Sequence, residues 1–364
     1  MEENFIFIFS NHFFIIGVII KFIPMGLCDF MAIKKRVRYI DQLRALAIIF
    51  VLFAHISTHT CKLLGGIYQI GSLKWASSAL LVDFGVIGVP LFLMITGALL
   101  LNRDYGDLPS FLKHRFLRIL PAFLFWALIF MHQVFTFWYV WLMMGIYLFL
   151  PIINSFIKEY GLKGAEYFLI VWFITILMNT FGYYPLYELE LSYFFGYIGY
   201  VVLGYYLFNK DFKISHGKLL IISFLLFLIC TLFGMHYTFY ESQIAGKQLW
   251  MTYLEIAVVL QGVGVFLFFK NLEDYGGNNK LLAFSKKIRL NKVVDSLSFC
   301  SYGMYLDHHI ILDPILGLAL VQELYALNPL YWMILAVFLI PFLSWIIVYI
   351  MSKIPYLKYF SGAY

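Results

Sequence analysis

Charged residues are scarce in this chain. Asp, Glu, Lys and Arg make up 13% of its 364 residues, which is about half the share found in soluble domains. Hydrophobic residues account for 63% of the sequence and aromatic residues for 20%. This composition excludes an ordinary soluble domain and indicates a protein embedded in a membrane.

Cysteine is also sparse, and it follows no pattern. The four cysteines are scattered, with no Cys-x-x-Cys pair and no metal-ligand spacing: Cys28, Cys61, Cys230 and Cys300. We therefore expect small buried residues, no disulfide framework and no metal site. The basic excess, a net charge of +6, is divided among short loops between apolar runs, so it does not indicate a nucleic-acid-binding surface.

Long apolar runs fill the rest of the chain. Ten segments are long enough to span a hydrocarbon core of about 20 residues. They centre on 43–61, 79–101, 117–132, 136–157, 165–182, 192–208, 218–235, 249–269, 297–317 and 330–350. The sequence therefore predicts an all-α fold, a polytopic membrane helix bundle of about ten transmembrane helices.

Lys and Arg gather in alternate loops of this bundle. Only Lys62, Lys74 and Lys247 lie in the opposite set of loops, while Lys21 and Arg44 lie within hydrophobic segments. Because basic loops remain in the cytoplasm, this asymmetry predicts cytoplasmic ends for the bundle. The expected location is the plasma membrane.

The first thirty residues form a hydrophobic extension, interrupted by Lys21 and Pro24. No clear signal-peptide pattern is present. Two interpretations are open. Either residues 1–30 are an upstream start that the cell does not use, with Met31 opening the protein, or they form an extra membrane-embedded or interfacial helix. The transmembrane domain is expected over residues 31–364.

An arginine and a histidine share the first predicted span. Arg44 and His55 are eleven residues apart in the run YIDQLRALAIIFVLFAHIS. At about 100° per residue, eleven residues return to within about 20° of the same face and advance about 16 Å. Ionisable groups are costly in lipid, so this stripe is a candidate functional site.

Five sequence blocks resemble the acyltransferase-3 family of integral membrane acyltransferases. In chain order they are RYIDQLRALAIIFVLFAH, GVPLFLMITGALLL, FLKHRFLRILPAFLFW, WYVWLMMGIYLFLPII and SYGMYLDHHIIL. The resemblance covers about residues 34–350. The chain departs from the family pattern at Asp307, a position that is usually bulky and apolar.

The resemblance implies transfer of an acyl group, usually acetyl from cytoplasmic acetyl-CoA, to a sugar hydroxyl. The acceptor expected from it is a cell-surface or lipid-linked glycan. We expect no appended extracellular esterase-like domain, and in this the chain resembles the short branch of the family that acts on surface polysaccharides and glycolipids. Acyl-CoA, a glycan and membrane lipid are the expected partners, and nucleic acid is not.

The candidate residues suit this chemistry. His55 has the pKa range of a general base, and packing as a structural histidine is its alternative role. Arg44 offers a fork of donors for an anion, and Asp41, three residues earlier, is expected to pair with it and orient it. Arg115 and Arg118 are candidates to hold the phosphates of coenzyme A, with ordinary membrane anchoring as the rival explanation.

Weaker candidates lie later in the chain. His308 and His309 are adjacent, so only one is expected to face a cavity, and the motif favours His308, with a relay or orienting role. Glu255, inside a predicted helix, is expected to pair with a cation or accept sugar hydroxyls. An outer loop rich in tyrosine, 183–193, suits carbohydrate faces or an interfacial aromatic belt.

Two rival functions remain open at this point. The first is an exporter of a glycan or lipid-linked sugar, with Arg44 and His55 lining a translocation path. No internal repeat of the kind that transporters often carry is evident in the sequence. The second is a catalytically inactive scaffold for a polysaccharide synthase, against which the intact Arg44 and His55 argue.

Overall fold

The computed structural model describes residues 37–62, 70–130, 137–182, 191, 194, 196–246, 249–276 and 290–364. The chain divides into two units, Met1–Arg38 and Tyr39–Tyr364, and the second contains the helix bundle. The N-terminal extension, residues 1–30, and nearly all of the tyrosine-rich outer loop lie outside the described residues.

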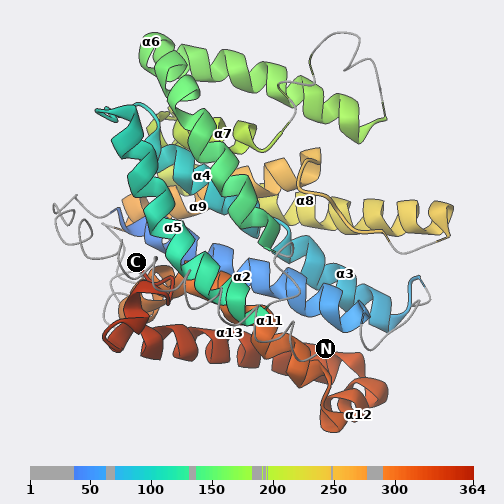
Figure 1. Cartoon of the computed structure of the whole chain (residues 1–364). Helices are drawn as coiled ribbons and strands as arrows, with labels where there is room; N and C mark the ends of the chain where they lie inside the picture. The colour runs from blue at the N-terminus through green and yellow to red at the C-terminus, as the bar shows by residue number, and fades with distance from the viewer. Residues whose placement is uncertain are drawn as a thin grey trace. The chain divides into compact units, whose positions relative to one another are not determined.

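The described residues are helical and contain no β-strand. The elements are α2 (Arg38–Thr60), α3 (Leu73–Gly85), α4 (Gly88–Leu100), α5 (Leu108–Phe130), α6 (Trp138–Thr180), α7 (Ile198–Asn209), α8 (His216–Ala245), α9 (Ile256–Gly276), α11 (Leu290–Leu316), α12 (Ala319–Leu327), α13 (Pro329–Lys353) and the 3-10 turn η5 (Leu357–Tyr359). Figure 1 shows their arrangement. The predicted all-α membrane fold is confirmed.

The number of spans differs from the expected ten. By length and apolar character, six described helices can cross a membrane, or seven if α11 and α12, bent by 77°, count as one span. One reason is that α6 is counted as one span, although a break at Gly161, where φ is 57° and ψ is −139°, divides it into two helices that match two of the expected segments. Another is that α7 has only 12 residues. The expected cytoplasmic position of both ends stays a prediction.

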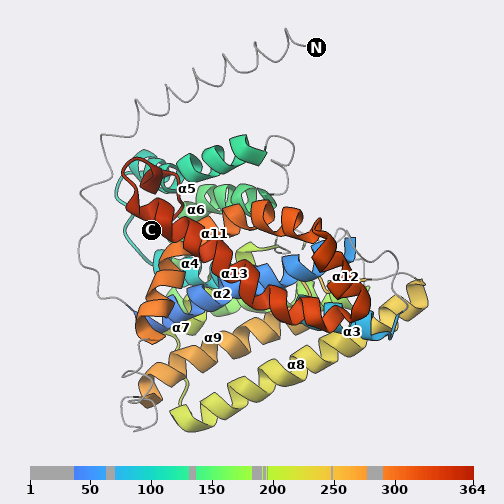
Figure 2. The same ribbon diagram turned by 90° about the horizontal axis from the view of Figure 1, so that it is seen from below.

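Helix α2 lies at the centre of this unit. It lies between α11 and α13 on one side and α8 and α9 on the other (Figure 2). Ser57 of α2 donates a hydrogen bond to the carbonyl of Ser78 in α3 at 2.8 Å, and Trp332 of α13 donates one to Thr60 at 3.0 Å. The helix that carries Arg44 and His55 is therefore held on several sides.

Glycines let α3 and α4 approach α2 closely. A Cβ atom added at Gly85 would lie 2.5 Å from the backbone nitrogen of Ala54, and one at Gly88 would lie 2.7 Å from the carbonyl oxygen of Ala47. Small residues of this kind allow membrane helices to pack backbone against backbone.

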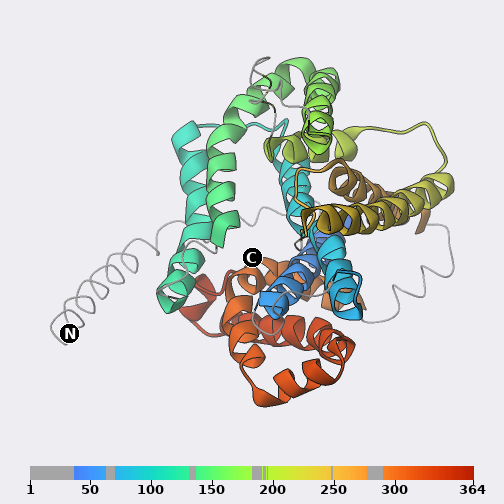
Figure 3. The same cartoon turned by 90° about the vertical axis from the view of Figure 1, so that its right-hand side faces the viewer.

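The remaining helices pack in groups around α2. Helix α8 packs on α9, α4 on α7, and α11 on α13. Helices α5 and α6 run side by side, while α11, α12 and α13 gather on another side of the unit (Figure 3). Residues from α2, α4, α5, α6 and α11 consequently meet around one interior region.

The close crossing of α4 and α7 leads to a prediction about the free energy of unfolding. A Cβ atom at Gly97 would lie 1.7 Å from the carbonyl oxygen of Val201, so Gly97→Ala must push the two helices apart. We expect a loss of about 1–3 kcal/mol, typical of overpacking, seen as a lower midpoint of thermal unfolding in detergent.

The matched control is Gly145→Ala in α6, because nothing lies within 4 Å of a Cβ atom at that position. Replacing an open helical glycine by alanine is expected to stabilise the helix by up to about 1 kcal/mol. Equal unfolding midpoints for the two variants would contradict the close crossing of α4 and α7.

Candidate functional site

Arg44 is held by two partners that join α2 to α11. Its guanidinium donates to Asp41 at 3.3 Å and to the hydroxyl of Ser298 at 3.3 Å. Ser298 in turn donates to the same carboxylate oxygen of Asp41 at 3.0 Å. Asp41 therefore pairs with Arg44 as expected, whereas the contribution of Ser298, 254 residues away in the chain, was not foreseen.

A cavity of about 160 Å³ opens beside Arg44. Arg115 and Arg118 of α5 line the same cavity, so three arginines separated in sequence meet there. The other lining residues are apolar, aromatic or hydroxyl-bearing: Phe92, Ile95, Thr96, Leu99, Leu100, Ile119, Tyr139, Val140, Met143, Tyr147, Phe299, Ser301, Tyr302, Tyr305 and Tyr364. No carboxylate side chain is among these described lining residues, so the cavity is suited to an anion.

The two α5 arginines rest against aromatic rings. The guanidinium of Arg115 lies 5.3 Å from the ring centre of Phe111, and that of Arg118 lies 5.1 Å from the ring centre of Tyr364. The buried Nε of Arg115 makes no hydrogen bond within the described part of the chain. A buried donor without a partner is unusual and suits a site that waits for an acceptor.

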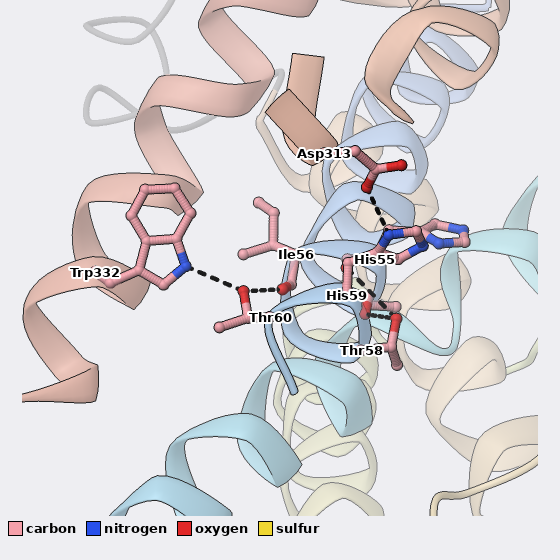
Figure 4. A network of polar contacts seen from close by, with 8 residues as sticks. His55, Ile56, Thr58, His59, Thr60, Asp313 and Trp332 are labelled. Atoms are coloured by element: carbon pink, nitrogen blue, oxygen red, sulfur yellow. Dashed lines mark hydrogen bonds and ion pairs between the residues drawn. The ribbon is translucent and has the colours of Figure 1, made fainter. Parts of the chain in front are cut away.

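A second group of polar side chains lies further along α2, towards its C-terminal end. We call His55, His59, His308, His309 and Asp313 the histidine cluster. The ring centre of His55 lies 4.8 Å from that of His308 and 5.0 Å from that of His309. His59 contacts His309 with ring centres 4.6 Å apart, and its Nδ1 lies 2.8 Å from a carboxylate oxygen of Asp313 (Figure 4).

Only one of His308 and His309 was expected to face a cavity, and neither is among the residues that line the cavity beside Arg44. Both rings instead contact His55, and both side chains are buried, at 1% and 4% exposure. Adjacent residues point about 100° apart on a helix, yet two long planar side chains can both reach one ring on the neighbouring helix.

Tyr305 connects the cavity with the histidine cluster. Its side chain lines the cavity, and its ring centre lies 5.9 Å from that of His308, which is one helical turn further along α11. The rings of Tyr305 and Tyr139 are also in contact, with centres 5.3 Å apart. Tyr305 therefore lines the cavity with the three arginines and also lies beside the histidine cluster.

Two expected candidates lie outside this arrangement. Glu255 directly precedes α9 rather than lying inside a helix, and it accepts a hydrogen bond from the backbone of Thr252 at 2.7 Å. Asp307 is buried against α13, where Ser344 donates a hydrogen bond to it, so its carboxylate does not join the histidine cluster.

His59 was missed as a candidate, although its spacing carried a signal. His55 and His59 are four residues apart, as are His309 and Asp313, and such pairs share one helix face. Two groups of side chains in the cluster can hold a metal ion: His55 with His308 and His309, and His59 with His309 and Asp313. The sequence predicted no metal site.

Comparison with known proteins gives one match. The model of the acyltransferase-3 family, described as an acyltransferase domain, matches residues 37–135 and 131–350. No curated protein and no solved structure matches the chain. The matched residues take in α2, the arginines of α5 and the histidines of α11, and they cover most of the chain. This protein thus belongs to the acyltransferase-3 family of membrane acyltransferases.

Proposed function

We propose that this protein is an O-acyltransferase of the plasma membrane. It transfers an acyl group, in the first instance acetyl, from acyl-CoA to a hydroxyl of a cell-surface or lipid-linked glycan. The observation that carries the proposal is the convergence of Arg44, Arg115 and Arg118 on one cavity, whose lining residue Tyr305 lies beside His308, a ring neighbour of His55. Membership of the acyltransferase-3 family supports the class of reaction.

The arginine cavity suits coenzyme A. Phosphate groups prefer the planar fork of donors that arginine presents, and hydrogen bonds between charged groups are about twice as strong as neutral ones. Apolar and tyrosine side chains line the rest of the cavity and fit the uncharged parts of the donor. Asp41 and Ser298 hold the Arg44 side chain in place, so this side chain loses little conformational freedom when an anion binds.

His55 is the proposed general base. The oxygen of the acceptor hydroxyl attacks the thioester carbonyl carbon while His55 takes the hydroxyl proton. The new ester bond forms, the carbonyl–sulfur bond breaks, and coenzyme A leaves as the thiol after receiving a proton. His308 and His309, which contact the His55 ring, help to fix its orientation.

Substitution of His55 tests the chemical step. We expect His55→Ala to lower kcat by about 10²- to 10⁴-fold, the range for losing a general base, with little change in KM for acetyl-CoA. The measurement is incorporation of label from radiolabelled acetyl-CoA into the glycan and lipid fractions of membranes at matched expression.

The control for this experiment is His236→Ala, which removes an exposed histidine of α8 outside the cluster. If the His55→Ala variant transfers the acyl group as fast as the unsubstituted protein, His55 is not the general base. No label with the unsubstituted protein, across several acyl-CoA donors and with native glycan present, would favour the exporter instead.

A second prediction separates donor binding from membrane anchoring at α5. Loss of one charge-assisted hydrogen bond costs about 1.5–3 kcal/mol, so Arg115→Gln and Arg118→Gln should each raise KM for acetyl-CoA about tenfold or more. If Arg115 and Arg118 bind the 3′-phosphate of coenzyme A, these substitutions should raise KM less for an acyl donor that lacks this phosphate.

Lys113→Gln is the matched control, since Lys113 is an exposed cation on the same helix that does not line the cavity. If Arg115 and Arg118 only anchor the helix in the membrane, all three substitutions should have the same effect, a change in the amount of protein in the membrane or in its orientation. A KM unchanged in both arginine variants would contradict donor binding by α5.

A further inference from the structure

The histidine cluster contains more titratable side chains than a single general base requires. Four imidazoles and one carboxylate from two helices meet, and neighbouring rings lie 4.1–5.9 Å apart, centre to centre. Membrane interiors seldom hold such groups without a function, because each one is costly to place in an apolar environment. A bound cation would give these side chains a common partner.

We propose that His59, His309 and Asp313 bind a divalent transition-metal ion, with Zn²⁺ the expected ion. Two imidazoles and one carboxylate form a common three-ligand set for zinc, which leaves a fourth position for water or another ligand. The same donor types also accept other first-row metals, so the set defines the chemical class of the ion.

The geometry of the three side chains is close to that of a metal site. Their ligand atoms all lie within 4.8 Å of one another. Bonds of about 2.0–2.1 Å in a tetrahedral site separate two ligand atoms by about 3.3 Å. The ligand atoms of His59 and Asp313, 2.8 Å apart, must therefore separate slightly when a metal ion binds, and the remaining separations in the set, none above 4.8 Å, must approach this value.

Charge favours this set over the alternative in the same cluster. Asp313 is a ligand that cancels one of the two positive charges of the ion, whereas His55, His308 and His309 are all neutral ligands and leave both charges on the metal centre. The chosen set also leaves His55, the proposed base, without a metal bond.

Access favours the same set. The side chains of His59 and Asp313 are 21% and 29% exposed, so they offer an entry path that the nearly buried His308 lacks. Local spacing helps as well, because His309 and Asp313 are one helical turn apart on α11 and project from one face. Together with His59 they would clamp α2 to α11.

The test is metal content. The full-length chain, carrying an affinity tag without histidine, is purified in mild detergent, and bound metals are measured by mass spectrometry after dialysis. We expect about one equivalent of Zn²⁺ per chain, and a thermal unfolding midpoint that rises on adding Zn²⁺ and falls with a chelator.

Substitutions assign the ligands. Asp313→Asn, which nearly preserves shape, and His59→Ala should each weaken Zn²⁺ binding by about 100-fold or more. His308→Ala and His236→Ala should keep the metal, since neither residue belongs to the proposed set. Gel filtration and thermal unfolding show whether each variant is folded. If the His59→Ala variant is not folded, the Asp313→Asn variant alone tests whether this set binds the metal.

Several results would overturn the inference. They are an unsubstituted protein that holds no metal and does not respond to added Zn²⁺, a folded Asp313→Asn protein that binds Zn²⁺ normally, and a folded His308→Ala protein that loses it. In the first case, His59 and Asp313 form a simple hydrogen-bonded pair. Metal content is measured without acyl donor or acceptor, so this result is independent of the proposed transferase activity.

Discussion

An arginine within a membrane-spanning helix is stable only if protein groups replace the water that it has lost. In α2 this replacement is made by Asp41 and by Ser298 of α11, and Arg44 and Ser298 both donate to the same carboxylate oxygen of Asp41. The cost of leaving a buried charge without its partner is several kcal/mol. The contact between α2 and α11 is therefore required by electrostatics as well as by packing, and the cavity and the histidine cluster both lie along it.

The same pair of helices supplies groups for both halves of the proposed reaction. Towards the start of α2, Arg44 faces the cavity together with the arginines of α5. Further along, His55 meets the histidines of α11. In the proposed reaction, donor binding and proton transfer would take place at different depths of one helix interface, and Tyr305 lies between the two groups of side chains.

Much of this arrangement could be predicted from the sequence, and the reasons are local. Helical geometry alone placed Arg44 and His55 on one stripe and Asp41 beside Arg44. The contact between Arg44 and Ser298 could not be predicted, because it depends on which helices become neighbours. For the same reason the contacts of His308 and His309 with His55, and of Asp313 with His59, could not be predicted. The break in α6, by contrast, was predicted, because Gly161 lies with Lys158 and Lys163 between the expected apolar segments 136–157 and 165–182.

The close approach of Gly85 and Gly88 to α2 has a consequence for motion. Backbones in such contact cannot slide past one another by a helical turn without steric clash, so α2, α3 and α4 must move as one body. His55 and Arg44 then stay in fixed positions on α2, which is the preorganisation that the proposed catalysis requires. For a bulky glycan, the acceptor proposed above, any opening that admits it would have to come from displacement of other helices around this rigid group.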